Sequence, residues 1–225
     1  MANGKRRPLL VLIHGILARQ TTPGWPERLA EWLWKKPTSF ASVTRRYAAG
    51  PFPLWNVFFK NRRLALALAN DLEVFAQDGA ELNFVTHSNG ADIAVKAMKI
   101  LAKRGYKTNT AIFVGAAISC DIGRSGLYEL HQTGFLKRAF AYCSETDLAL
   151  RFRVTWPYGH LGRVGFRFGG VDDGYWNLHT TRRDEEPGNG FFTRWFPGGH
   201  TGYWQPENEL ATFEQILRDL NPVPF

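Results

Sequence analysis

The sequence contains little cysteine and no recognisable cluster of metal-binding residues. Only Cys120 and Cys143 are cysteines among 225 residues, and one pair offers neither a disulfide framework nor a metal-site spacing. We expect both thiols to be reduced and buried, as in a reducing compartment. No HExxH motif or comparable ligand set occurs, so no metal and no other cofactor is predicted.

Long hydrophobic runs are also missing. No apolar segment approaches the roughly 18 residues that a membrane-spanning helix needs. The start has Lys5-Arg6-Arg7 before the apolar residues 9–13, as in a short signal peptide, but no small-residue cleavage site follows. We therefore read 9–13 as a strand and expect a cytoplasmic protein without a transmembrane segment.

The charge is biased towards basic residues, with a formal net charge of +8 and an isoelectric point near 9.7. Such a bias favours anionic substrates, acidic lipid surfaces or nucleic acid as partners. The basic residues are nevertheless scattered in pairs such as Arg45-Arg46, without a long basic run or a nucleic-acid motif. We expect no nucleic-acid partner and at most weak association with anionic surfaces. Oligomeric state is left open.

The chain contains enough hydrophobic residues to form one substantial core. Hydrophobic residues make up 44% of the chain, and neither internal repeats nor a linker divides it. We predict a single domain over residues 1–225.

Buried strands alternate with amphipathic helices along this domain. Helices are predicted from Pro26 to before Pro37, over 61–77, over 91–103, and at the end around Phe213. Such alternation predicts a three-layer α/β/α sandwich around a mostly parallel sheet of about six strands, which binds ligands at the carboxyl ends of the strands. The predicted strands are 9–13, 42–47, 82–85, 110–118, 138–144 and, less regular, 175–181.

The turn Thr86-His87-Ser88-Asn89-Gly90 connects the strand at 82–85 directly to the following helix. A serine on so tight a turn is raised above the sheet edge, with its hydroxyl facing a cleft. The N–H of the next residue lies near a helix N-terminus and can help to hold an oxyanion. The turn therefore predicts a nucleophilic Ser88.

This turn resembles the nucleophile elbow of the α/β-hydrolase superfamily, usually written G-x-S-x-G, with Thr86 in place of the first glycine. A His-Gly pair after the first strand, His14-Gly15, is similar to a second feature of that superfamily. The resemblance implies that the backbone N–H of Ile16, or alternatively of Leu17, provides one oxyanion donor and that of Asn89 the other. A simple strand-to-loop turn is the alternative interpretation of His14-Gly15.

A serine hydroxyl needs a base, and the chain has six histidines. His14 and His87 are fixed by their own turns, and His131 precedes the predicted acid. His200 lies on a glycine-containing loop between the last strand and the last helix, and we predict it as the base. His160 and His179 are the alternatives.

A carboxylate is needed to fix the tautomer of that histidine. Asp147 follows the strand at 138–144 and completes the order Ser, acid, His that the superfamily shows. A purely structural alternative is that Asp147 caps a helix starting near Leu148. The rival acids are Glu145, Asp121 and the Asp172-Asp173 pair.

The surroundings of His200 are rich in aromatic residues. We predict that Trp195, Phe196 and Tyr203, together with Leu17, line a substrate pocket, with simple packing of an irregular region as the alternative. Only about 20 residues separate the fourth and fifth predicted strands, which leaves no room for a large lid insertion.

The resemblance therefore implies a serine hydrolase that cleaves carboxylic esters of short or medium acyl chains, as an esterase or lipase does. Ser88, His200 and Asp147 would form and hydrolyse an acyl-enzyme from a small-molecule ester. An acyltransferase or thioesterase with the same residues is the alternative, followed by a non-catalytic binding protein. Serine instead of aspartate at the elbow disfavours dehalogenase chemistry.

Overall fold

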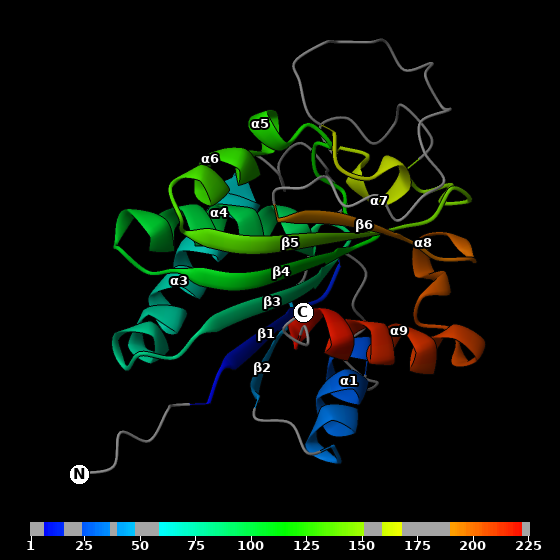
Figure 1. The fold of residues 1–225 in the computed structure, drawn as a ribbon, viewed down its shortest axis with the longest axis horizontal. Coiled ribbons are helices and arrows are strands. Elements are labelled where there is room, and N and C mark those ends of the chain that lie inside the picture. The colour runs from blue at the N-terminus through cyan, green and yellow to red at the C-terminus, as the bar shows by residue number, and fades with distance from the viewer. Residues whose placement is uncertain are drawn as a thin grey trace.

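The computed structural model of the chain describes residues 7–15, 24–36, 40–47, 59–150, 159–167 and 190–221. These residues form one six-stranded sheet in the order β2-β1-β3-β4-β5-β6 (Figure 1). Every neighbouring pair is parallel, which confirms the predicted α/β sheet. The strands are β1 Leu9–Ile13, β2 Ala41–Arg45, β3 Leu82–His87, β4 Thr108–Val114, β5 Leu136–Cys143 and β6 Phe191–Trp195.

The first five strands overlap the predicted ones, and all of them except β1 differ from the predicted bounds by a few residues. β4 ends at Val114 instead of 118, because Gly115 takes a φ of 50° and turns the chain. The sixth described strand is Phe191–Trp195. The predicted strand at 175–181 lies outside the described residues.

Helices cover both faces of the sheet (Figure 1). α3, α4, α5, α6 and α7 share one core cluster, and α1 and α9 share the other. The predicted three-layer sandwich is therefore correct. The described helices are α1 Trp25–Trp34, α3 Asn61–Gln77, α4 Gly90–Lys103, α5 Ile122–Ser125, α6 Leu127–Gln132, α7 Leu161–Val164, α8 Gly199–Gly202 and α9 Pro206–Leu220.

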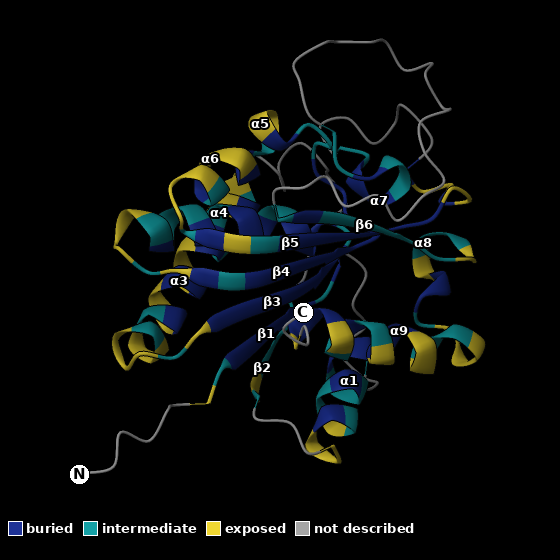
Figure 2. Ribbon diagram, viewed as in Figure 1, coloured by how far each residue is buried: buried dark blue, intermediate teal, exposed yellow. Residues whose placement is uncertain are grey.

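β1 shows why its sequence is continuously apolar. Leu9, Val11 and Ile13 pack with α3 and α4, whereas Leu10 and Leu12 pack with α1 and α9. Because successive side chains of a strand point to opposite faces, a strand covered on both faces needs an unbroken apolar run. The central strands accordingly form the buried interior in Figure 2.

The connection from β4 to β5, residues 115–135, contains the two short helices α5 and α6. The proposal of one domain over 1–225 without a large lid covers ranges outside the described residues and stays a prediction. Among the described helices, none is long and apolar enough to cross a membrane.

Candidate active site

Ser88 occupies the tight turn that the sequence predicted. β3 ends at His87 and α4 begins at Gly90, so only Ser88 and Asn89 connect them. Ser88 has a φ of 54°, and no other non-glycine residue in the described ranges has a positive φ. Such a conformation is strained and persists only where its surroundings enforce it. Here the Ser88 N–H donates to Val114 O at 3.1 Å, and the Ser88 carbonyl accepts from the Ala117 N–H at 3.1 Å.

Close backbone packing explains the glycines around this turn. A Cβ atom on Gly15 would lie 2.9 Å from the Cβ atom of Ser88, and one on Gly90 would lie 2.8 Å from His14 O. The position of Thr86, in contrast, accommodates a side chain. Thr86 is fully buried, and its hydroxyl donates to Ile112 O on β4 at 3.4 Å.

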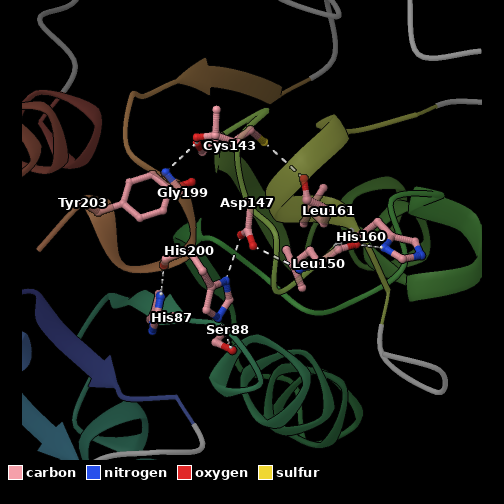
Figure 3. A network of polar contacts seen from close by, with 12 residues as sticks. His87, Ser88, Cys143, Asp147, Leu150, His160, Leu161, Gly199, His200 and Tyr203 are labelled. Carbon is pink, nitrogen blue, oxygen red and sulfur yellow. Dashed lines mark hydrogen bonds and ion pairs between the residues drawn. The ribbon is translucent and has the colours of Figure 1, made fainter. Parts of the chain in front are cut away.

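The structure brings His200 and Asp147 to Ser88 (Figure 3). His200 Nε2 lies 3.0 Å from Ser88 Oγ, and His200 Nδ1 lies 2.8 Å from Asp147 Oδ2. Since a carboxylate only accepts, Nδ1 carries the proton of the neutral ring and Nε2 presents its lone pair to the serine hydroxyl. A hydroxyl in this arrangement can lose its proton to the imidazole as it attacks an electrophile.

Asp147 is held in place by the turn after β5. Its side chain is fully buried, and its Oδ1 atom accepts the Leu150 N–H at 3.0 Å. No helix starts near Leu148 among residues 144–150, so the capping alternative is wrong there, and the bond to Leu150 closes a local turn. The other carboxylate oxygen, Oδ2, is left to orient the imidazole.

His200 lies in the short helix α8, where the sequence predicted a loop, and this helix is attached to the sheet on two sides. The Gly199 N–H donates to Ser144 Oγ at 3.0 Å, at the end of β5. The His200 carbonyl accepts the Nε2–H of His87 at 2.9 Å, at the end of β3. These two hydrogen bonds fix the backbone on either side of the His200 side chain (Figure 3).

His87 is buried and neutral. Burial, reinforced by the proximity of His200, lowers its pKa from 6.5 to about 3. Its ring meets Trp204 edge-on at 5.8 Å between centroids, and Trp204 stacks on Trp25 at 4.3 Å. His87, Trp204 and Trp25 thus form a packed aromatic cluster next to the His200 ring, which the sequence analysis did not predict.

The alternative bases and acids make other contacts. His160 Nδ1 donates to Leu150 O at 2.6 Å, and Asp121 accepts the Gly123 N–H at 2.8 Å and so caps α5. Glu145 is exposed. His179 and the Asp172-Asp173 pair lie outside the described residues.

Of the expected oxyanion donors, only Asn89 belongs to the described part of the chain; Ile16 and Leu17 lie outside it. Within the described ranges, the Asn89 backbone N–H donates to no acceptor. It follows Ser88 directly at the start of α4, where unpaired N–H groups and the helix dipole favour negative charge.

The Asn89 side chain takes part in a buried polar network that the sequence did not reveal. Asn61, the first residue of α3, donates to Asn89 Oδ1 at 2.8 Å and accepts from Asn89 Nδ2 at 3.2 Å. Both residues are fully buried. Asn61 Nδ2 also donates to Asp92 on the first turn of α4, 2.7 Å away, so the pair joins α3 to the residues that follow Ser88.

The predicted pocket residues have different positions. Tyr203 is fully buried in the core, and its hydroxyl donates to Tyr142 O at 3.1 Å. Trp195 and Phe196 line an open hollow of about 470 Å³, together with Ser144, Thr146 and Gly198, the residue before α8. Ser88 does not line that hollow.

The sequence matches no protein-family model and no curated protein. Solved structures of thioesterases are nevertheless similar. The thioesterase RedJ from the prodiginine biosynthetic pathway of Streptomyces coelicolor has a TM-score of 0.53 at 14% identity, covering 95% of this chain and 90% of its own. Human thioesterase 2 has a TM-score of 0.51 at 12% identity, covering 95% and 96%.

The thioesterase domain of NocB, in a covalent complex with a fluorophosphonate nocardicin G analogue, has a TM-score of 0.51 at 13% identity and covers 95% of both chains. Identities this low establish the architecture alone. Together with the parallel sheet, the flanking helices and the turn at Ser88, they show that this chain has the α/β-hydrolase fold.

Proposed function

We propose that this chain is a serine acyl hydrolase with Ser88 as its nucleophile and acyl thioesters as its preferred substrates. The observation that carries the proposal is the continuous hydrogen-bonded line from Ser88 Oγ through the His200 ring to Asp147. It lies at the carboxyl ends of the strands, where parallel α/β sheets bind ligands.

The geometry leads to a two-step reaction. Ser88 Oγ attacks the acyl carbonyl carbon while His200 Nε2 takes its proton, and the Asn89 N–H donates to the developing oxyanion. The tetrahedral intermediate then collapses, and His200 protonates the departing thiolate. Water, deprotonated by His200, hydrolyses the acyl-enzyme and releases the carboxylic acid. Asp147 keeps the imidazole in the required tautomer and stabilises the imidazolium.

Thioesters are placed ahead of carboxylic esters because the similar solved structures are named as thioesterases. Cleavage of carboxylic esters, which the sequence led us to expect, uses the same three side chains and differs only in the leaving group. An acyltransferase would replace water by another acceptor. Measuring which substrates the protein turns over distinguishes these three activities.

The test compares S-acyl N-acetylcysteamine thioesters with p-nitrophenyl esters of the same acyl chains. We expect the wild type to have a higher kcat/KM for thioesters, and Ser88→Ala to lose turnover of both. Ser42→Ala, at an exposed position on β2, is the matched control and should retain full activity. Preferential ester turnover would restore the ester-hydrolase expectation. Turnover that survives in Ser88→Ala, or its absence from the wild type, would refute the proposal.

A further inference from the structure

The short helix α7, which His160 precedes, is hydrogen-bonded to the chain that supports the nucleophile. The Gly162 N–H donates to Ala116 O at 2.9 Å, in the segment that follows β4. The next residue of that segment, Ala117, donates its N–H to the carbonyl of Ser88 at 3.1 Å. α7 is therefore attached on one side to the backbone that holds Ser88 in its strained conformation.

α7 is attached on its other side to the end of β5. The Gly162 carbonyl accepts the Ser144 N–H at 3.0 Å, and the Leu161 carbonyl accepts a hydrogen bond from the Cys143 thiol at 3.1 Å. The backbones approach so closely that a Cβ atom on Gly162 would lie 2.2 Å from the carbonyl carbon of Gly115. α7 therefore has little freedom to move and is a rigid base for the residue that precedes it.

His160 uses its side chain to hold the residue that binds Asp147. Its Nδ1 atom lies 2.6 Å from the carbonyl oxygen of Leu150, and because a carbonyl only accepts, Nδ1 carries the proton. The same Leu150 donates its N–H to Asp147 Oδ1 at 3.0 Å. Leu150 is buried and Asp147 is fully buried. A continuous series of contacts therefore leads from His160 to the His200 ring (Figure 3).

The orientation of the Asp147 carboxylate depends on few contacts. Among the described residues, Leu150 is the only hydrogen-bond donor to Oδ1, and His200 is the only partner of Oδ2. Without the bond at Oδ1 the carboxylate is free to rotate about χ2, and rotation moves Oδ2 away from His200 Nδ1. Since Oδ2 fixes the tautomer of His200 and stabilises its imidazolium, a displaced Leu150 should slow the reaction without changing substrate binding.

Building on the proposed hydrolase function, we propose that His160 is a positioning residue that acts on Asp147 through Leu150. The attachment of α7 to both neighbouring segments fixes the imidazole of His160. The imidazole fixes the Leu150 backbone, and that backbone fixes the carboxylate. The contribution of His160 is therefore to the orientation of the acid and not to a proton transfer.

The experiment uses the different reach of asparagine and glutamine. The amide nitrogen of asparagine is as many bonds from Cβ as Nδ1 of histidine is, whereas that of glutamine corresponds to Nε2. We therefore expect His160→Asn to keep the donor to Leu150 O and to stay within about twofold of the wild-type kcat on a thioester. His160→Gln and His160→Ala should each lower kcat by about tenfold, with KM changed by less than about twofold.

His131→Ala is the matched control. His131 Nδ1 donates to Leu136 O at 2.9 Å, so it forms the same kind of hydrogen bond at the amino end of β5, the end opposite to Asp147. Its kcat should stay within about twofold of the wild type. A double-mutant cycle adds a second readout: in an Asp147→Asn background, His160→Ala should lower kcat no further, because it acts through the carboxylate.

A wild-type kcat in His160→Ala, an equal loss in His160→Asn, or a further loss in the Asp147→Asn background would overturn the positioning role and leave the proposed hydrolase intact. If the wild type turns over no thioester or ester, the hydrolase proposal fails instead, and proton NMR decides the positioning role. The Nδ1 proton of His200, donated to a buried carboxylate, should resonate far downfield. This resonance should persist in His160→Asn and move upfield or disappear in His160→Ala. An unchanged resonance in His160→Ala, or its absence from the wild type, would overturn the role.

Discussion

His87 donates its Nε2–H to the carbonyl of His200, 2.9 Å away, so the residue before Ser88 supports the backbone of the residue that contacts Ser88 Oγ. The Nδ1 atom of His87 is buried and has no hydrogen-bond partner within the described part of the chain. Burial lowers the pKa of His87 to about 3, so the ring is neutral and its one proton is on Nε2.

The lowered pKa of His87 predicts a loss of stability in acid. An unfolded histidine has a pKa near 6.5, so below that pH the unfolded state binds a proton that folded His87 refuses until about pH 3. The free energy of unfolding should fall from pH 6.5 towards 3, with a contribution of up to ~1.4 kcal/mol per pH unit from this group. His87→Gln, which keeps an N–H donor but does not titrate, should reduce the slope by about that amount. Urea unfolding between pH 4.5 and 7 measures it, and equal slopes would contradict the assignment.

Strain at Ser88 predicts an unusual order of stabilities. Because Ser88 has a φ of 54°, Ser88→Gly should be more stable than Ser88→Ala by about 1 kcal/mol, since glycine alone adopts this region without steric cost. Both variants should be inactive. Chemical denaturation of the two variants measures the difference in their free energies of unfolding. Equal values would contradict the prediction and show that the turn relaxes when Ser88 is replaced.

Asp147→Asn should lower kcat by about 10³- to 10⁴-fold at neutral pH. The amide keeps the shape of the carboxylate but favours the wrong tautomer of His200 and does not stabilise the imidazolium. Steady-state kinetics on a thioester provides the measurement. Glu145→Gln, at an exposed position two residues earlier, is the control and should stay within about twofold of the wild type. A normal rate in Asp147→Asn would remove Asp147 from the proposed mechanism.

The Asn61–Asn89 pair should couple stability to activity. Asn61→Ala leaves the fully buried Asn89 amide without its reciprocal partner, which should cost about 1–3 kcal/mol of unfolding free energy. It should also lower kcat, because the Asn89 N–H is the proposed oxyanion donor. Asn70→Ala removes a hydrogen bond from the exposed surface of the same helix and should change stability by less than ~0.5 kcal/mol. If Asn61→Ala changes the free energy of unfolding and kcat as little as Asn70→Ala does, Asn61 has no positioning role.

Much of the fold was predictable because its strands are covered on both faces. β1 is an unbroken apolar segment and β3 is buried along its whole length. Ser88, Asp147 and His200 follow β3, β5 and β6, and these positions at one edge of a parallel sheet predicted that they would meet. β6 was harder to predict. It lies at the sheet edge, four of its five residues are only partly buried, and its composition gives no clear alternation.

The features that sequence missed all depend on contacts between distant segments. Asn61 lies 28 positions before Asn89, and nothing in its local sequence distinguishes it from an ordinary helix-start asparagine. Tyr203 belongs to an aromatic-rich segment typical of either a pocket or a core, and its full burial and its hydrogen bond to Tyr142 O assign it to the core.

The central claim is that Ser88 is a nucleophile activated by His200. Its most direct test is covalent labelling with a fluorophosphonate, read by intact mass and peptide mapping. We predict one adduct per wild-type chain, located on Ser88, absent from Ser88→Ala and formed far more slowly in His200→Ala, while Ser42→Ala is labelled as the wild type is. Labelling at another residue, or at an undiminished rate without His200, would contradict the account.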